Sequence, residues 1–427
     1  MNIANAIAAV RQGDYDETLK KLYPRFDADP EKYLGRIEAL LNAYTEHFPA
    51  PEEIHLFSAP GRIEVGGNHT DHQHGNVLAA AIDRDMIAAA AENGKDKISV
   101  YSVGYGGLEI DLKDLEPHDD EKETTASLVR GVTAKIANAG FPVKGFNVCI
   151  TSDVPGGSGI SSSAAFEVLY GEVLNGLFCD GKLSPVDLAK FGQYAEQKYF
   201  GKPSGLMDQT ASAVGGFVAI DFKDTADPVI RAVSPEKLSK NYAIFVIDTG
   251  SAHADLSNVY AGIPTEMRSV AARFGKNVLR EVDENEFYAK IGQVRKEVGD
   301  RAVLRTIHFF EENQRAIDEA AALERGDIDE FLRIVKESGF SSFVHLQNVI
   351  ISGNVEHQDV AYALAVARHA LQGKGAYRVH GGGFAGTIMA FVPVEMAESF
   401  KQSVEEQLFP GACVLMSIRP VGCAQVF

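Results

Sequence analysis

Hydrophobic residues recur at helical spacing through the first fifty residues of the chain. The stretch "PEKYLGRIEALLNAYTEHF" repeats its apolar positions with the 3.6-residue period of a helix that buries one face. Those positions are Tyr33, Ile37, Leu40, Leu41 and Tyr44. Prolines at positions 49 and 51 end the pattern. We therefore predict an N-terminal helical extension over residues 1–50.

From residue 54 onward the pattern changes to short strands separated by glycines. "IHLFSAPGRIEV" and "KISVYSVGYGGLEIDL" are rich in β-branched and aromatic residues, which strands favour. "GFNVCITSDVP" alternates in the same way. Helical spacing returns in "ASLVRGVTAKIANAG", which ends at a glycine, and in "SSSAAFEVLYGEVLNGLF". We expect residues 51–230 to form one lobe that mixes strands and helices.

The second half of the chain repeats this mixture without repeating the sequence. A strand in "YAIFVIDTG" precedes long helices at 265–340 and 357–373, and strands follow around "YRVHGGGFAGTIMAFV" and "ACVLMSIRPV". The pattern changes around "DFKDTADPVIRAVSPEK". We expect a second lobe over residues 231–427, and an α+β fold for the whole chain.

Composition and charge narrow the class of protein. The 427 residues are 45% hydrophobic and 23% charged, as in ordinary globular proteins. The net charge of −18 argues against a nucleic-acid or anionic-membrane partner. The four cysteines form no CxxC pair, which fits a reducing compartment, and no apolar run reaches the ~20 residues that span a bilayer. We expect a cytoplasmic protein, and the sequence indicates no particular protein partner.

The segment "SDVPGGSGISSSAAFEV", residues 152–168, has the order strand, glycine-rich turn, helix. Glycines let the main chain bring its N–H groups close to a ligand, and the helix start adds a positive dipole end. The three serines, Ser161 to Ser163, supply further donors. This pattern predicts a nucleotide phosphate site that is not a Walker A loop. A serine-capped helix after a glycine turn would give the same pattern without a ligand.

Five segments of the chain resemble those of the GHMP small-molecule kinases, and specifically of galactokinases. "VPGGSGISSSAAFEV" resembles their second motif, and "GRIEVGGNHTDHQHG" resembles their sugar signature, GRxNxIGEHxDYxxG. "QYAEQKYFGKPSGLMDQ", "RTIHFFEENQR" and "HGGGFAG" follow in the family's order, so that the resemblance covers about residues 55 to 395. It implies a two-lobed α+β fold with its active site in the interlobe cleft. The N-terminal lobe would be ribosomal protein S5 domain 2-like and the C-terminal lobe ferredoxin-like.

The resemblance also implies an ATP-dependent sugar 1-kinase and gives roles to its residues. Asp208 matches the catalytic aspartate, and Arg62 matches the arginine that pairs with it and stabilises the γ-phosphate. Whether Asp208 removes the hydroxyl proton or only fixes a negative charge stays open. Glu196 matches the Mg²⁺ ligand, together with Ser162 or Ser163. The predicted ATP-binding residues are Pro155, Gly156, Gly157, Ser158, Gly159, Ser161, Ser162 and Ser163.

The same resemblance assigns a sugar-binding floor. Its predicted residues are Asn68, His69, Asp71, Gly205 and Tyr260. The glycines at 381–383 are expected to pack behind the phosphate loop. A metal site made of His69, Asp71, His72 and His74 is an alternative for this segment, although strand alternation would send neighbouring side chains to opposite faces.

The chain departs from the sugar signature at several positions. Asn68 replaces the usual glutamate, Glu64 replaces the usual asparagine, and His72 replaces the usual tyrosine. An amide at position 68 can donate as well as accept a hydrogen bond, so it would tolerate a carboxylate at C6 of the sugar. We predict galactose as the substrate, because the rest of the chain resembles galactokinases more closely, and keep galacturonate or another galacto-configured sugar as the alternative. A non-catalytic sugar sensor is a third possibility, against which the chain retains "SSSAA", Glu196 and the catalytic pair.

Overall fold

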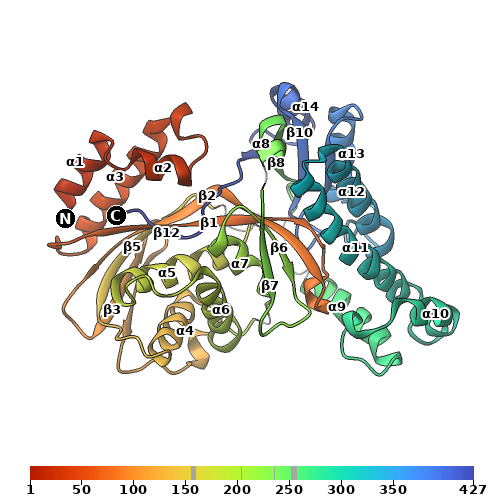
Figure 1. Ribbon diagram of the computed structural model, residues 1–427, viewed down its shortest axis with the longest axis horizontal. Helices are drawn as coiled ribbons and strands as arrows, with labels where there is room; N and C mark the ends of the chain where they lie inside the picture. The colour runs from red at the N-terminus through yellow and green to blue at the C-terminus, as the bar shows by residue number, and fades with distance from the viewer. Residues whose placement is uncertain (155–159, 203, 235, 252–256) are drawn as a thin grey trace.

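Two β-sheets organise the chain in the computed structural model, which describes residues 1–154, 160–202, 204–234, 236–251 and 257–427. The larger sheet has the order β12-β1-β2-β5-β3-β4, with β6 and β7 joined to it through β2, and the smaller has the order β11-β8-β10-β9 (Figure 1). The predicted α+β class is confirmed. The larger sheet contains β1 (His55–Gly66), β2 (Asn76–Glu92), β3 (Lys97–Ser102), β4 (Gly106–Asp111), β5 (Phe146–Ser152), β6 (Phe217–Asp221), β7 (Val229–Val233) and β12 (Ala424–Gln425).

The long strand β2 is buried on both faces, which explains its nearly continuous apolar sequence. Ile87, Ala89 and Ala91 belong to the apolar cluster under the N-terminal helices. Ala88 and Ala90, which alternate with them, belong to the cluster on the opposite face. The period of two residues thus holds, but both faces take hydrophobic side chains.

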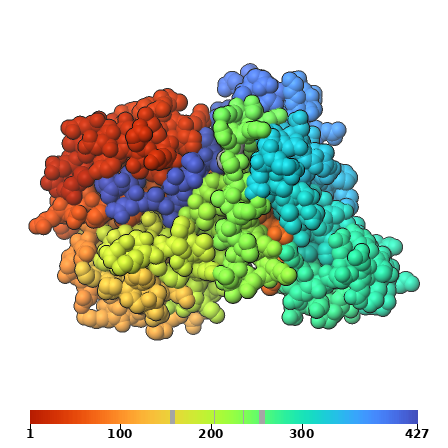
Figure 2. Space-filling model, viewed as in Figure 1, coloured from red at the N-terminus to blue at the C-terminus, as the bar shows by residue number. Residues whose placement is uncertain are grey.

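Three helices of the N-terminal segment cover one face of the larger sheet. They are α1 (Ile3–Gln12), α2 (Asp16–Leu22) and α3 (Pro30–His47). Asn2 and Asp29 cap α1 and α3 by accepting hydrogen bonds from main-chain amides. The C-terminal segment returns to this region, where β12 pairs with β1 (Figures 1 and 2).

Helices on the other face of the larger sheet carry much of the candidate site. They are α4 (Thr125–Asn138), α5 (Ser162–Phe178), α6 (Pro185–Ala195), the π-helical turn η4 (Glu196–Phe200) and α7 (Met207–Val214).

The smaller sheet contains β8 (Tyr242–Asp248), β9 (Ala376–Val379), β10 (Thr387–Pro393) and β11 (Cys413–Met416). The remaining helices are α8 (Glu236–Asn241), α9 (Ser257–Arg273), α10 (Glu284–Val298), α11 (Asp300–Arg325), α12 (Ile328–Ser341), η6 (Ser342–Leu346), α13 (Asp359–Leu371) and α14 (Ala397–Gln407).

The division into residues 1–50, 51–230 and 231–427 stays a prediction. Strand β7 runs across the expected boundary at residue 230 and pairs with β6, and β12 brings the end of the chain back to the larger sheet. Among the residues that the structure describes, no helix has the length and apolar character needed to cross a membrane.

Candidate active site

An ion pair between Arg62 and Asp208 lies at the centre of the candidate site. Arg62 Nε lies 2.7 Å from Asp208 Oδ1. The Ser161 hydroxyl donates to the other carboxylate oxygen of Asp208 and accepts from Arg62 Nη2. These residues come from β1, from the N-cap of α5 and from the first turn of α7. The structure therefore brings the predicted catalytic pair to the start of the predicted nucleotide-binding helix.

Local irregularities of the backbone orient this unit. The pairing of β1 with β2 shifts register between Pro60 and Arg62 and again between Glu64 and Gly66, and such bulges re-aim side chains. Ser161 has a φ of 53°, which is uncommon for a residue other than glycine. Its hydroxyl does not cap α5, because it contacts the ion pair instead. No sequence pattern indicates that contact, and phosphate binding by Ser161 stays a prediction.

The electrostatic surroundings keep Asp208 ionised. Burial would raise its pKa, but the charge of Arg62 and the hydrogen bonds from Arg62 and Ser161 outweigh burial and lower the pKa to about 2. The side chain is 29% exposed, so the carboxylate also faces open space. Asp208 can therefore accept a hydrogen bond from an alcohol at neutral pH.

Asp208 faces a small polar cavity of about 140 Å³. Its walls come from β1, from the loop after it, from the segment before α7, from α9 and from the glycines after β9. They include Arg62, Glu64, His69, Asp71, His72, Lys202, Gly205, Asp208, Tyr260, Gly381 and Gly382. Four of the five predicted sugar-binding residues therefore line the same cavity as the catalytic pair. This cavity lies between elements from the first and the second half of the chain.

The fifth, Asn68, lies behind the cavity wall. Its side chain is fully buried, and its Nδ2 donates to Glu64 Oε1 and to the Gly381 carbonyl, both at 2.7 Å. Asn348 donates to its Oδ1 at 2.9 Å. The residue that lines the cavity is Glu64, whose pKa is raised to about 7 because burial outweighs the nearby charge of Arg378. Asn68 therefore does not reach the cavity, where we expected it to contact a carboxylate at C6 of the sugar.

The floor of the cavity is formed by a turn, where we expected a strand. Asp71 begins the 3₁₀ turn η2 (Asp71–Gln73), and a Cβ at Gly205 would lie 2.7 Å from its Oδ2, so a larger residue there would displace the carboxylate. His69 Nε2 lies 3.0 Å from the Gly382 carbonyl, which can only accept, so Nε2 carries the hydrogen. Burial lowers the pKa of His69 to about 3, and its Nδ1 has no partner among the described residues. His69 is thus a neutral side chain with a free acceptor.

The alternative metal site is not formed by these residues. His72 Nε2 lies 3.0 Å from the Tyr260 hydroxyl, and His69 is held by the Gly382 carbonyl. Among the described residues, no three His, Cys, Asp or Glu side chains are grouped so that they could hold a metal ion. Tyr260 also packs on Gly382, where a Cβ would lie 2.6 Å from its ring. This glycine segment therefore contacts the sugar cavity, whereas we expected it to lie behind the phosphate loop.

A separate cavity of about 430 Å³ opens at the N-terminus of α5. Ser162 and Ser163 line it together with apolar side chains that include Met86, Leu128 and Phe166. Amides at the first turn of a helix and its dipole favour an anion, and an apolar pocket beside them suits a flat ring. The predicted residues Pro155, Gly156, Gly157, Ser158 and Gly159 lie outside the described residues.

The predicted metal ligand Glu196 is part of a buried polar cluster beside α7. Lys202 Nζ lies 2.9 Å from its Oε1, and Gln209 Nε2 donates to its Oε2 at 3.0 Å. Gln209 also donates to Glu167 at 2.9 Å, which links the cluster to α5. Lys202 lines the sugar cavity as well. Sequence reasoning missed it, although it lies in "GKPSG" between Glu196 and Asp208.

The chain is similar to known proteins in both sequence and fold. Residues 127–216 match the model of the GHMP kinases N terminal domain, and residues 42–92 match the galactokinase galactose-binding signature. The structure of a Methanococcus jannaschii mevalonate kinase superposes with a TM-score of 0.61 at 14% identity, covering 86% of this chain and 99% of the other, which shows the fold alone. Fold and family model together define the class, the GHMP kinases.

Two relatives of the chain are galactokinases. A galactokinase of Limosilactobacillus fermentum is 30% identical over 86% of this chain and 93% of its own. The crystal structure of Lactococcus lactis galactokinase complexed with galactose has a TM-score of 0.77 at 26% identity and covers 91% of this chain and 99% of the other. The chain belongs to the galactokinase family.

Proposed function

We propose that this protein transfers the γ-phosphate of ATP to the anomeric hydroxyl of galactose and releases galactose 1-phosphate and ADP. The contact of Ser161 with Arg62 and Asp208 carries the proposal. Through this contact the ionised Asp208, which lines the small polar cavity, is joined to the start of α5. Helix α5 in turn lines the separate cavity of about 430 Å³. The galactose-binding signature at residues 42–92 supports the choice of sugar.

The arrangement suits direct transfer without a covalent enzyme intermediate. Asp208 accepts a hydrogen bond from the C1 hydroxyl and holds its oxygen toward the γ-phosphorus, while Arg62 offsets the negative charge of the acid and the phosphate. The new bond joins this oxygen to phosphorus, the bond from phosphorus to the β-phosphate oxygen breaks, and ADP leaves. A carboxylate with a pKa of about 2 is a weak base. Asp208 therefore orients the hydroxyl first and receives its proton late, as the oxygen becomes acidic.

Mg²⁺ would be held by Glu196 with the hydroxyl of Ser162 or Ser163. These are the hard oxygen donors that Mg²⁺ prefers, and the buried Oε1 of the neighbouring Glu167 lacks a partner among the described residues, which leaves a further oxygen in the cluster. When bound, the ion would neutralise charge on the phosphates. Lys202 balances the charge of Glu196 and lies between that glutamate and the sugar cavity.

The charge of the sugar cavity favours a neutral sugar over a uronic acid. Asp71 and Asp208 line it with carboxylates, and Glu64, whose pKa is about 7, adds a partial negative charge at neutral pH. Of the two cations, Arg62 is paired with Asp208 and Lys202 with Glu196. Among the described residues of these walls, a sugar carboxylate would find no cation without an ion-pair partner, and like charges in contact cost several kcal/mol.

ADP release with different acceptors tests this function. With ATP and Mg²⁺, galactose should give sugar-dependent ADP release, and galacturonate should be poorer in kcat/KM by at least roughly 100-fold, because of that repulsion. ADP release that does not depend on the sugar would contradict the proposal. Preference for galacturonate would overturn the choice of sugar and leave the kinase assignment standing.

The exchanged pair Glu64 and Asn68 should behave as a unit. Asn68→Glu places two carboxylates in buried contact, and Glu64→Asn removes the acid that faces the cavity. Each single variant should lower kcat/KM for galactose by at least about ten-fold, and the double variant should recover most of the loss, because it again has one acid and one amide. The measurement is a double-mutant cycle on kcat/KM, with melting temperatures to confirm folding. Strictly additive losses would show that the two positions act independently.

A further inference from the structure

A second, larger cavity opens from the sugar cavity and has no role in the proposed reaction. Its volume is about 630 Å³, against about 140 Å³ for the sugar cavity. Asp71, His72, Ser204 and Gly205 line both cavities, so the two cavities are adjacent and share a wall. We call it the outer cavity. Its size falls within the range of roughly 300–1,000 Å³ that is usual for small-molecule sites.

The outer cavity lies on the side of the sugar cavity away from the catalytic pair. Neither Asp208 nor Arg62 lines it, and neither do the serines of α5. In the proposed reaction the C1 hydroxyl lies at Asp208, so the far side of the sugar ring faces Asp71 and Gly205, the shared wall. A substituent on that side of the ring would point toward the outer cavity.

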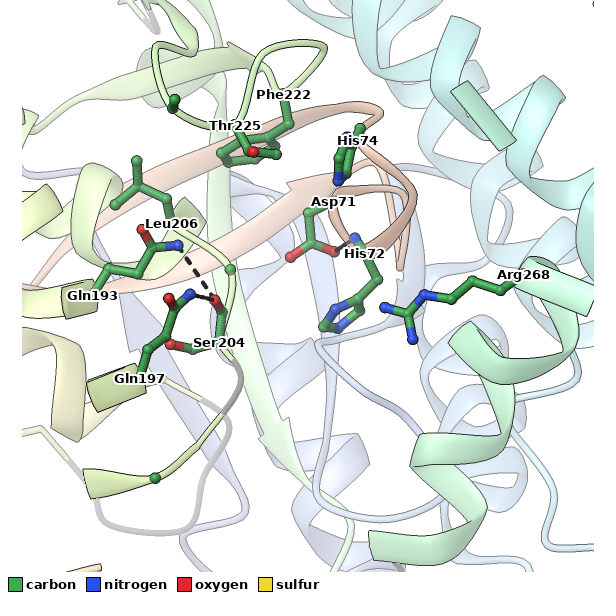
Figure 3. Close-up of a pocket in the computed structure, with 13 residues that line it drawn as sticks. Asp71, His72, His74, Gln193, Gln197, Ser204, Leu206, Phe222, Thr225 and Arg268 are labelled. Carbon is green, nitrogen blue, oxygen red and sulfur yellow. Dashed lines mark hydrogen bonds between the residues drawn. The ribbon is translucent and has the colours of Figure 1, made fainter. Parts of the chain in front are cut away.

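The walls of the outer cavity are built to bind a polar ligand. Gln193 and Gln197 come from α6 and η4, and both donate from Nε2 to the Ser204 carbonyl, at 3.3 and 2.8 Å (Figure 3). These bonds fix the two amides, while their side-chain carbonyl oxygens have no partner among the described residues. The buried hydroxyl of Ser204 also lacks one. Fixed amides with free acceptors suit the hydroxyls of a sugar.

The opposite wall offers a cation and the upper wall an aromatic ring. Arg268 extends from α9 toward His72 (Figure 3) and makes no ion pair with a described residue. The chain has 59 aspartates and glutamates against 41 lysines and arginines, so most cations have an acidic partner within reach. Its guanidinium presents several donors in one plane, which suits neighbouring hydroxyls. Phe222 adds an apolar surface on which the C–H face of a sugar can pack.

We propose that the outer cavity binds a second sugar ring, so that the enzyme phosphorylates the reducing-end galactose of a disaccharide. The inference rests on the proposed function. The chemistry is unchanged: the C1 oxygen of the reducing-end ring forms the bond to the γ-phosphorus, ADP leaves, and the hydroxyl proton passes to Asp208 and then to solvent. The second ring supplies binding only.

The test compares galactose with three disaccharides that carry galactose at the reducing end, substituted at O3, O4 or O6. At least one should be phosphorylated with a kcat/KM within about ten-fold of that of galactose. For that disaccharide, Gln197→Ala and Arg268→Ala should each raise KM about ten-fold, the equivalent of one or two lost hydrogen bonds. KM for galactose should change less than two-fold, roughly the scatter between neutral surface variants. Arg273→Ala, on the same helix but paired with Glu297, is the matched control.

The results distinguish a failure of the second-ring site from a failure of the proposed galactose kinase function. Turnover of galactose with no turnover of any disaccharide overturns the second-ring site and leaves the sugar kinase standing. Disaccharide turnover that both variants leave unchanged overturns the assignment of these walls. No turnover of any sugar removes the proposed function and the inference together. Galactose turnover by the variants also shows that they are folded.

Discussion

Asp208→Asn is expected to lower kcat for galactose by roughly 10²–10⁴-fold, the range for loss of a positioned acid–base group. The amide keeps the size of the carboxylate and can still accept a hydrogen bond, so the sugar should bind with less than about a ten-fold change in Kd. What is lost is the negative charge that orients the C1 hydroxyl and pairs with Arg62. Steady-state ADP release gives kcat, and titration calorimetry gives the affinity for galactose.

Two further variants serve as comparisons for Asp208→Asn. Asp329→Asn changes an exposed aspartate in the first turn of α12, the same helix position, and should leave kcat unchanged. Ser161→Ala removes one hydrogen bond to Asp208 without removing charge and should cost about ten-fold in kcat. A folded Asp208→Asn protein with turnover within ten-fold of the parent would contradict the role of this acid.

Asp85→Ala should destabilise the protein by about 3–5 kcal/mol, the usual cost of removing one partner of a buried ion pair. The Asp85 carboxylate is fully buried and accepts hydrogen bonds from Arg36, Tyr23, Ser58 and Arg419. These residues join the N-terminal extension, β1 and the C-terminal segment to β2. Without Asp85, two guanidinium groups would stay in the interior unpaired. Urea unfolding measures the loss.

The effect of Asp85 should also depend on pH in one direction. Burial would raise its pKa, but Arg36 and Arg419 outweigh burial and lower it. The carboxylate therefore contributes its full stability above the unfolded value of about 3.9, and this is lost as the pH falls through the lower folded value. The difference in unfolding free energy between parent and variant should be constant from pH 5 to 8 and shrink below about pH 4.

A surface control tests the Asp85 account. Asp153→Asn changes an aspartate that is 36% exposed and paired with Arg84, and it should cost less than about 1 kcal/mol. Because the N-terminal helices cover the sheet face opposite α5 and α7, folded Asp85→Ala protein should keep the parent KM for galactose. A loss near that of Asp153→Asn would show that the buried network is not what holds the extension to the sheet.

Much of the fold could be predicted because the hydrophobic pattern depends on local geometry. The helical period of residues 30–47 corresponds to one helix with a defined buried face, and the alternation of residues 146–152 corresponds to one strand. The apolar run of β2 shows no such contrast, since both of its faces are buried. Asp83, Arg84 and Asp85 interrupt this apolar run in the sequence. The structure shows that Asp85 is the centre of a buried network.

The candidate site could be predicted by residue type but not by placement. The sequence motifs named Arg62 and Asp208, and the ion pair brings them together as expected. No local pattern shows that Ser161 adopts a left-handed conformation and turns its hydroxyl to that pair, or that Glu64 lines the cavity while Asn68 lies behind it. Both depend on bulges and long-range contacts, which a local pattern does not encode.

The most direct test of the central claim is the identity of the product. After incubation with galactose, ATP and Mg²⁺, ³¹P and proton NMR should show one new phosphate ester on C1 of galactose, formed in equal amount with ADP. The Asp208→Asn protein should form it at the reduced rate given above. Phosphate on any other carbon, or inorganic phosphate as the sole product, would contradict the account.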